Sequence, residues 1–173
     1  MRYVKILLPM LAIIAFFSCR KDDDYYWGTI SAQKNGAPWS AKIRATKSNS
    51  DDSKVEIIIN TLDKNGVILE TLGFYKVSRV GGKYYLSPTF DASQSDSLIW
   101  CFYTNGYLDQ LYDSYLPSPQ DSTNYLEITE FDSKKEEIKG RFNLIVWPDI
   151  KGSWNAPDSI VFSGGEFHTR IND

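Results

Sequence analysis

The feature that most limits how this chain can fold is a series of tight-turn dipeptides between short apolar runs. Three Asn-Gly pairs occur, at 35–36, 65–66 and 105–106, and a Gly-Gly pair occurs at 81–82. A two-residue type I′ turn needs positive φ at both central residues, which these pairs adopt at little cost. The flanking runs are rich in β-branched and aromatic residues, so each pair predicts an antiparallel hairpin.

The runs between the turns have the periodicity of strands. In EIKGRFNLIVW, residues 137–147, alternate positions from Ile138 to Val146 fall on one face and charged side chains fall on the other. This period of two is typical of a strand with one face in the core. The runs at 55–59 and 98–103 are apolar on both faces, which indicates central or doubly covered strands. LDQLYDSYL, residues 108–116, is the one segment that fits a helical turn.

These patterns predict an all-β fold of about ten strands: a single antiparallel meander that forms a β-sandwich or a β-barrel. Further turns are expected at 132–135 and at 164–165, the latter interrupting the last strand. Proline cannot donate to a strand ladder, so regular pairing is not expected at Pro117, Pro119, Pro148 and Pro157. The expected strands are 26–34, 37–46, 54–62, 67–78, 83–88, 97–104, 107–112, 124–131, 136–147 and 158–171.

Residues 1–18 have the pattern of a secretory signal peptide, with a short basic start and an uncharged apolar run at 6–17. The run is shorter than the about 20 residues that a membrane-spanning helix needs. Ser18 followed by Cys19 resembles a bacterial lipobox, although Phe16 stands where leucine is usual. The resemblance implies cleavage before Cys19 and lipid attachment to its thiol. An ordinary signal peptide or a buried helix, with Cys19 incidental in either case, is the alternative.

Residues 19–25 are expected to form the lipidated cysteine and a solvated acidic tether, because adjacent like charges repel and stay in water. A lysine followed by aspartates behind the cysteine resembles the surface-export signal of Bacteroidota lipoproteins. That resemblance implies an outer-membrane protein that faces the cell exterior, and a plain tether is the alternative. Residues 26–173 are then expected to form one all-β domain. The residues of the export signal are Lys21, Asp22, Asp23 and Asp24.

Three longer motifs resemble an uncharacterised family, a domain of unknown function, of Bacteroidota surface lipoproteins. They are WGTISAQKNGAPWSA at 27–41, YLEITEFDSKKEEIKGRFNL at 125–144 and IVFSGGEFHTRI at 160–171. Shared features are an Asn-Gly-x-x-Trp hairpin, a strand–Asp turn–strand and a final Gly-x-Phe strand. The resemblance implies an all-β fold and a surface location, and such families mostly have no assigned function. Residues 89–123 carry no part of it.

Charge and cysteine content narrow the classes of partner. Removal of the signal leaves 155 residues, and loss of Arg2 and Lys5 from the 19 basic residues leaves 17 against 22 acidic ones, a net charge of −5. A nucleic-acid partner would need a basic stripe, so none is expected. If lipid takes Cys19, then Cys101 has no partner within the chain, and its apolar run predicts a buried, unreactive thiol.

No catalytic residue is predicted. His168 is the single histidine and is expected on the solvent face, so a histidine-based triad or a zinc site with several histidines is excluded by count. Glycoside hydrolysis needs two carboxylates about 5–10 Å apart. Asp109 with Asp113, or Glu127 with Glu130, are the candidate pairs, and the second pair is expected on opposite faces of a strand.

No cofactor and no metal site is predicted either. Loop aspartates, at 51–52 and at Asp109, Asp113 and Asp121, offer oxygen ligands for calcium, but their spacing is not that of an EF-hand.

Binding is the favoured class of function. Aromatic residues make up 25 of the 173, and tyrosine and tryptophan offer an apolar face with a polar handle that suits sugars or peptides. The alternative for each ring is core packing. We expect a non-catalytic role that binds a glycan, a small apolar ligand or a protein partner; a structural subunit of a surface assembly or adhesin is the alternative, and a glycoside hydrolase-type enzyme is less favoured than either. The candidate ligand-binding residues, in or near loops, are Tyr103, Tyr107, Tyr112, Tyr115 and Trp154.

Overall fold

The computed structural model describes residues 25–49, 51–89, 98–118 and 122–172, and this part of the chain contains eleven strands and no helix. Cys19 and the export-signal residues 21–24 lie outside the described residues. The strands are β1 (Gly28–Lys34), β2 (Ala37–Ser40), β3 (Lys42–Ser48), β4 (Asp51–Leu62), β5 (Ile68–Ser78), β6 (Gly82–Ser87), β7 (Leu98–Tyr107), β8 (Gln110–Pro117), β9 (Tyr125–Asp132), β10 (Glu137–Lys151) and β11 (Ile160–Asn172).

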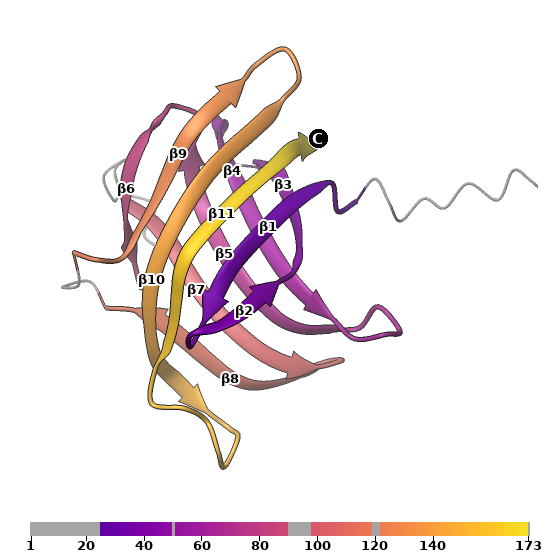
Figure 1. Ribbon diagram of the computed structural model, residues 1–173, viewed down its shortest axis with the longest axis vertical. Helices are drawn as coiled ribbons and strands as arrows, with labels where there is room; N and C mark the ends of the chain where they lie inside the picture. Colours follow the sequence, from indigo (N-terminus) through magenta and orange to yellow (C-terminus); the bar gives the residue numbers. More distant parts are fainter. Residues whose placement is uncertain (1–24, 50, 90–97, 119–121, 173) are drawn as a thin grey trace, which may run out of the picture.

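Eight strands close into a barrel (Figure 1). They pair in the ring β3–β4–β5–β7–β6–β9–β10–β11, and β11 returns to β3. β8 pairs with both β7 and β10 at one end of the ring, while β1 lies on β11 and carries β2. The predicted all-β class is confirmed, and of the two predicted architectures the structure is the barrel, in which closure removes the free edges of the ring.

The connectivity departs from a simple meander. β6 pairs in parallel with β7, and β11 pairs in parallel with β3. The predicted hairpin at Gly81-Gly82 is wrong, because β5 pairs with β7 and β6 pairs with β9. The chain turns at these glycines but passes to a different neighbour, and β7 later occupies the place between β5 and β6. The residues of a turn do not indicate that a later strand will pair between the two strands that the turn connects.

Two of the Asn-Gly pairs behave differently. Asn35 and Gly36 have φ of 51° and 78° and join β1 to β2, as predicted for a type I′ turn. The pair at 105–106 instead lies inside β7, and the turn falls at Leu108, with φ of 53°. A Cβ on Gly106 would stand 2.3 Å from the carbonyl oxygen of Gln110. This glycine therefore serves a close backbone approach at a bulge, and the hairpin tip lies two residues beyond it.

The segment 108–116 forms no helical turn; most of it is β8. Pro117 and Pro148 both lie in paired strands, so the expectation that they exclude pairing is wrong. Proline is tolerated at bulges, and the register of β8 and β10 shifts between Pro148 and Ile150. β8 thus continues the sheet around the end of the barrel.

Smaller differences concern two strand interruptions. The expected strand 37–46 is divided at Ala41 into β2 and β3. The expected break at Gly164-Gly165 is a bulge within β11: Gly164 has φ of 59°, and the register opposite it shifts between Phe142 and Leu144. β11 remains continuous, so it can pair with three different strands.

Apolar side chains fill the interior of the barrel. Two glycines leave the space that aromatic rings occupy. An added Cβ on Gly140 would stand 2.5 Å from the ring of Phe167, and one on Gly165 would stand 2.5 Å from the ring of Phe142. Cys101 is fully buried, as predicted, and burial raises the pKa of its thiol. The largest fully buried side chains are Tyr103, Tyr115, Phe74, Phe142, Phe162, Ile43, Ile57, Ile59, Leu72, Ile99, Leu126 and Ile128.

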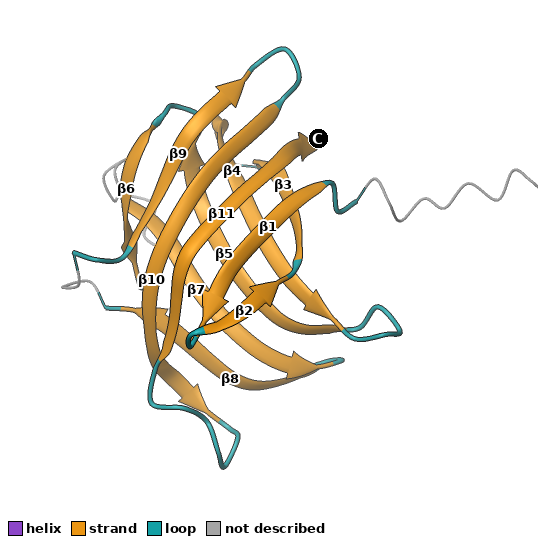
Figure 2. Ribbon diagram, viewed as in Figure 1, coloured by secondary structure: helices purple, strands orange, loops and turns teal. Residues whose placement is uncertain are grey.

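The barrel has two distinct ends. β1 starts beside the end of β11, because Gly28 pairs with Thr169, and the β9–β10 turn lies at this same end, which we call the upper end (Figure 1). The β1–β2, β4–β5 and β7–β8 turns and the β10–β11 loop lie at the opposite, lower end (Figure 2). The described chain therefore enters the barrel at the upper end.

Candidate functional site

Exposed apolar side chains gather at the lower end of the barrel. They come from the start of β5, the β7–β8 hairpin, the end of β10 and the β10–β11 loop. Large exposed apolar patches mark interaction sites, whereas single exposed apolar residues are ordinary. We call this set the apolar rim. Its members are Ile68, Tyr107, Leu108, Leu111, Tyr112, Ile150 and Trp154.

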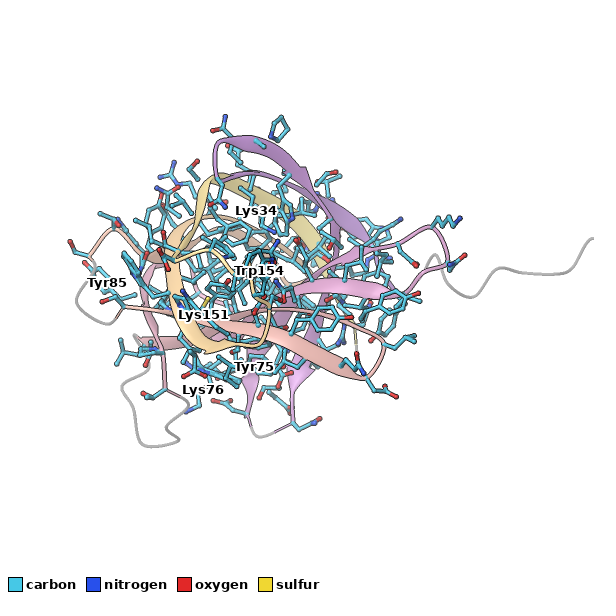
Figure 3. The ribbon with its side chains drawn as sticks, turned by 90° about the horizontal axis from the view of Figure 1, so that it is seen from below. Lys34, Tyr75, Lys76, Tyr85, Lys151 and Trp154 are labelled. Atoms are coloured by element: carbon cyan, nitrogen blue, oxygen red, sulfur yellow. The ribbon has the colours of Figure 1, made fainter. Side chains whose placement is uncertain are left out.

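Trp154 is the most exposed member of the apolar rim, with a relative solvent exposure of 100% for the residue. It stands at the tip of the loop that joins β10 to β11 (Figure 3). Seen from below, Trp154 lies near the middle of the lower end (Figure 3). An indole with no packing partner on the protein offers its whole surface to another molecule.

A buried carboxylate holds this loop in place. Asp113 on β8 is 1% exposed. It accepts hydrogen bonds from the backbone N–H groups of Gly152, at 3.0 Å, and Ser153, at 2.9 Å, and from the Ser153 hydroxyl, at 2.8 Å. Burial alone would raise the pKa of Asp113, but these donors outweigh it and lower the pKa, so the carboxylate is ionised at neutral pH.

Further contacts fix the rest of the loop. Gly152 donates its N–H to the carbonyl of Tyr112 at 2.8 Å, which joins the loop to β8. The Lys151 ammonium pairs with Asp158 at 2.7 Å across the base of the loop. The hydroxyl of buried Tyr115 donates to the carbonyl oxygen of Pro157 at 3.3 Å. The loop is thus tied at its base and at both sides while its tip stays free.

A polar cluster closes the inside of the barrel at the same end. The Lys34 ammonium forms an ion pair with Glu70 and donates to the Tyr103 hydroxyl at 2.8 Å. Trp39 donates its indole N–H to Glu70 at 3.0 Å. Burial would raise the pKa of Glu70, but Lys34 and the other donors lower it. Burial first, and the charge of Glu70 second, raise the pKa of Tyr103. The cluster joins β1 and β2 to β5.

A small cavity of about 280 Å³ lies beside this cluster. Residues 68–71 of β5, together with Thr104, Asn105, Gly106 and 108–111 of the β7–β8 hairpin, line it. Sites for drug-sized ligands measure about 300–1,000 Å³, so this cavity suits one ring or one side chain.

A second cavity, of about 360 Å³, lies between 116–118 and 147–149 beside the half-exposed Trp147.

Of the five aromatic residues predicted to bind a ligand, three are exposed and two are buried. Tyr107 and Tyr112 are about 40% exposed and lie on the apolar rim with Trp154. Tyr103 and Tyr115 are buried, with ring centroids 5.8 Å apart, because they face each other across the β7–β8 pair on its inner side. For these two residues the alternative, core packing, holds, and neither is a surface platform for a ligand.

The candidate carboxylate pairs are engaged elsewhere. Asp113 holds the loop, so it does not act with exposed Asp109. Glu127 and Glu130 were expected on opposite faces, which is wrong: an extra residue in β9 shifts the register between Ile128 and Glu130. Both therefore point outward, where Glu127 pairs with Arg141 at 2.8 Å and Glu130 pairs with Lys139 at 2.9 Å.

The single histidine has a structural environment. His168 Nε2 lies 3.0 Å from a Glu137 carboxylate oxygen, and its ring packs edge-on against Trp27 with centroids 5.3 Å apart. Over the described ranges, no group of three or more histidine, cysteine, aspartate or glutamate side chains is arranged to hold a metal ion. The same ranges contain no helix with the length and apolarity to cross a bilayer.

Two sets of contacts at the lower end were not predicted from the sequence. The Lys34–Glu70 pair joins residues 36 positions apart, and Asp113 reaches residues about 40 positions away. For the ion pair, the sequence does contain one indication: Glu70 occupies an inward position in the alternating run Glu70, Leu72, Phe74. A charged residue at an inward position predicts a partner, but not which one.

The chain matches no family model, and neither the curated proteins nor the solved structures contain a significant match to it. The resemblance to uncharacterised Bacteroidota surface lipoproteins stays a prediction.

Proposed function

We propose that this protein is a non-catalytic binding protein, lipid-anchored through Cys19 to the outer membrane and facing the cell exterior. The observation that carries the proposal is the concentration of exposed apolar side chains at the end of the barrel opposite the entry of the chain. Seven such side chains on neighbouring connections form a surface of the kind that recognises a ligand.

The position of the chain entry supports the orientation. The chain enters β1 at the upper end, beside the last residues of β11. A lipid on Cys19 would hold that end toward the membrane, and two or more acyl chains are needed for stable anchoring. The apolar rim would then face away from the bilayer, toward ligands outside the cell.

The polar side chains of the lower end support binding rather than chemistry. Asp113 and Glu70 are both held by several hydrogen-bond donors, and each has a pKa below its ordinary range. A general acid or base works best at neutral pH when its pKa lies near 7. The hydrogen bonds to these carboxylates favour roles in positioning the loop and closing the barrel.

Thermal unfolding with a ligand panel tests the proposal. The full chain in detergent is melted with glycans, peptides and small apolar compounds. A ligand at 100 times its Kd adds about 2.7 kcal/mol, which for a domain of this size raises Tm by about 5–10 °C. The shift is expected to disappear in Tyr112→Ala and to persist in Tyr85→Ala, because Tyr85, which is 52% exposed, lies on β6 outside the apolar rim. If no compound in the panel raises Tm, the result contradicts the binding role.

A structural subunit is the second candidate, and one observation favours it. β2 is the end of the sheet order and pairs with β1 alone, so one of its edges is open. An open edge recruits a further strand through backbone groups. However, β2 has four residues and contains Pro38, and short length and proline both protect an edge from pairing. Concentration-dependent self-association in analytical ultracentrifugation, abolished by a second proline in β2, would support this role.

A further inference from the structure

We propose that the β10–β11 loop and the apolar rim recognise a protein segment in which apolar side chains are flanked by lysine or arginine. Trp154 is the central contact, and the 280 Å³ cavity receives a basic side chain of the partner. This inference rests on the proposed binding function and names the chemistry of its ligand.

The first support is the rigidity of the loop around a free indole. Three hydrogen bonds to Asp113, the Lys151–Asp158 ion pair and the Tyr115 hydroxyl all hold the backbone next to Trp154. None of these contacts covers the indole, which is fully exposed. Tryptophan is enriched among residues that dominate binding energy. A loop that is already ordered loses little entropy on binding, which raises affinity.

The second support is the charge beside the apolar residues. Asp109 lies between Leu108 and Leu111 at the hairpin tip, and Asp149 precedes Ile150. Both carboxylates are exposed, and neither has a basic partner within ion-pair distance in the part of the chain that the structure describes. The nearby cation of Lys151 is already paired with Asp158. The lower end also carries the exposed cations of Lys64, in the β4–β5 turn, and Lys42, at the start of β3. The negative charge is therefore local to the hairpin tip and the end of β10, and a basic side chain complements it there.

The third support is the shape and lining of the cavity. Ile68, Leu108 and Leu111 provide apolar walls, and Asp109 lies among the lining residues. Glu70 also lines the cavity, but Lys34 already neutralises its charge. Lysine and arginine bury an apolar stem while the charged head stays in a polar environment. Such a side chain matches these walls and the free carboxylate of Asp109.

The same features disfavour a sugar or a lipid as the occupant. No aromatic residue is among the residues that line the cavity, so a pyranose would lack a ring on which to stack. The membrane, on the proposed orientation, lies at the opposite end of the barrel. A protein segment uses the whole rim, including the isolated indole and the cavity.

A random-peptide phage library is the probe. The full chain in detergent micelles is panned, and selected peptides are synthesised and measured by fluorescence anisotropy. We expect selected peptides to combine aromatic or aliphatic residues with lysine or arginine. Trp154→Ala should weaken their binding at least about tenfold, the loss typical of a central interface tryptophan. Asp109→Lys should also weaken binding, and added salt should reduce the affinity of the unmodified protein.

Controls separate the site from general stickiness and from misfolding. Trp154→Ala removes a side chain without packing contacts, so its melting curve should match that of the unmodified protein. Val80→Ala, which alters a 67%-exposed side chain at the upper end, should leave peptide binding unchanged. Asp113→Asn keeps the indole but loosens the loop, and a loss of affinity there, measured below its melting temperature, would support preorganisation.

The outcomes distinguish this inference from the proposed function. Selection of acidic peptides, or binding that survives Trp154→Ala, would overturn the inference. If no peptide binds but a glycan or an apolar compound raises Tm, the partner class is wrong and the binding function stands. If neither peptides nor the panel show any effect, both the inference and the proposed function fall.

Discussion

Asp113→Asn gives the sharpest test of how the lower end is built. The substitution keeps the size of the side chain but replaces one acceptor oxygen with an N–H₂ donor. Three donors now converge on the carboxylate, from Gly152 N–H, Ser153 N–H and the Ser153 hydroxyl. The asparagine can accept from at most part of this set, and its own donor would face other donors at a site that is 1% exposed.

Hydrogen bonds to a charged group contribute about 1.5–3 kcal/mol each, and leaving a buried donor unpaired costs a similar amount. Partial rearrangement of the loop recovers some of this, so we expect a loss of about 2–4 kcal/mol in the free energy of unfolding. For a domain of this size that corresponds to a fall in Tm of about 5–15 °C.

Circular dichroism melts of the full chain in detergent, with and without the substitution, measure the change. Hydrogen exchange at the amides of Gly152 and Ser153 locates it, because both amides should lose protection while the barrel strands keep theirs. Ser153→Ala serves as a matched control that removes one of the three donors and should cost less. A melting temperature within about 1 °C of the unmodified protein, with both amides still protected, would refute the assigned role of Asp113.

The pH dependence of this effect has a defined sign. The pKa of Asp113 is lowered in the folded state, so its contribution is present above the unfolded value of about 3.9 and is lost as pH falls through the folded pKa. The difference in stability between the unmodified protein and Asp113→Asn should therefore be constant above about pH 5 and shrink in stronger acid. A difference that grows on acidification would contradict the assignment.

Three further predictions concern other parts of the chain. Glu70→Ala leaves the Lys34 ammonium and the Trp39 indole N–H without their acceptor, so we expect a loss of about 2 kcal/mol, measured by thermal melts; an unchanged Tm would show that water replaces the carboxylate. Cys101 should react with a thiol reagent only after denaturant is added, since it is fully buried and burial raises its pKa; rapid labelling of the native protein would contradict this. Cys19→Ala should abolish lipid labelling and release the protein from membranes, and continued membrane attachment with lipid label would show that the lipobox interpretation is wrong.

The local character of the strands could be predicted well from the sequence. The alternation in β10 and the turn at Asn35-Gly36 are determined by neighbours in the chain, and both were predicted correctly. The insertion of β7 between β5 and β6 was not, because strand partners depend on packing over the whole barrel. The bulge in β9 was missed for the same reason, and it reversed the expected face of Glu130.

The candidate site was only partly predictable. Tyr107, Tyr112 and Trp154 were predicted as binding residues because they are aromatic and lie in or near loops, and they do lie on the apolar rim. Tyr103 and Tyr115 were predicted for the same reason but lie in the core. Among the tyrosines, the difference depends on the bulge at Gly106 and on the register of β7 with β8. The role of Asp113 depends in turn on the register of β8 with β10, which no local pattern contains.

The pairing of β11 has a consequence for how the protein reaches its native state. β11 hydrogen-bonds to β1, β10 and β3, so the ring can close only when the last described strand meets β3, near the start of the described chain. Contacts between residues as distant as Thr29 and His168 make folding slow. During that delay three strands present unpaired backbone, which is the state most prone to aggregation. Loss of residues 160–172 by proteolysis would expose all three at once, so an intact final strand decides whether the chain becomes a barrel or an open sheet.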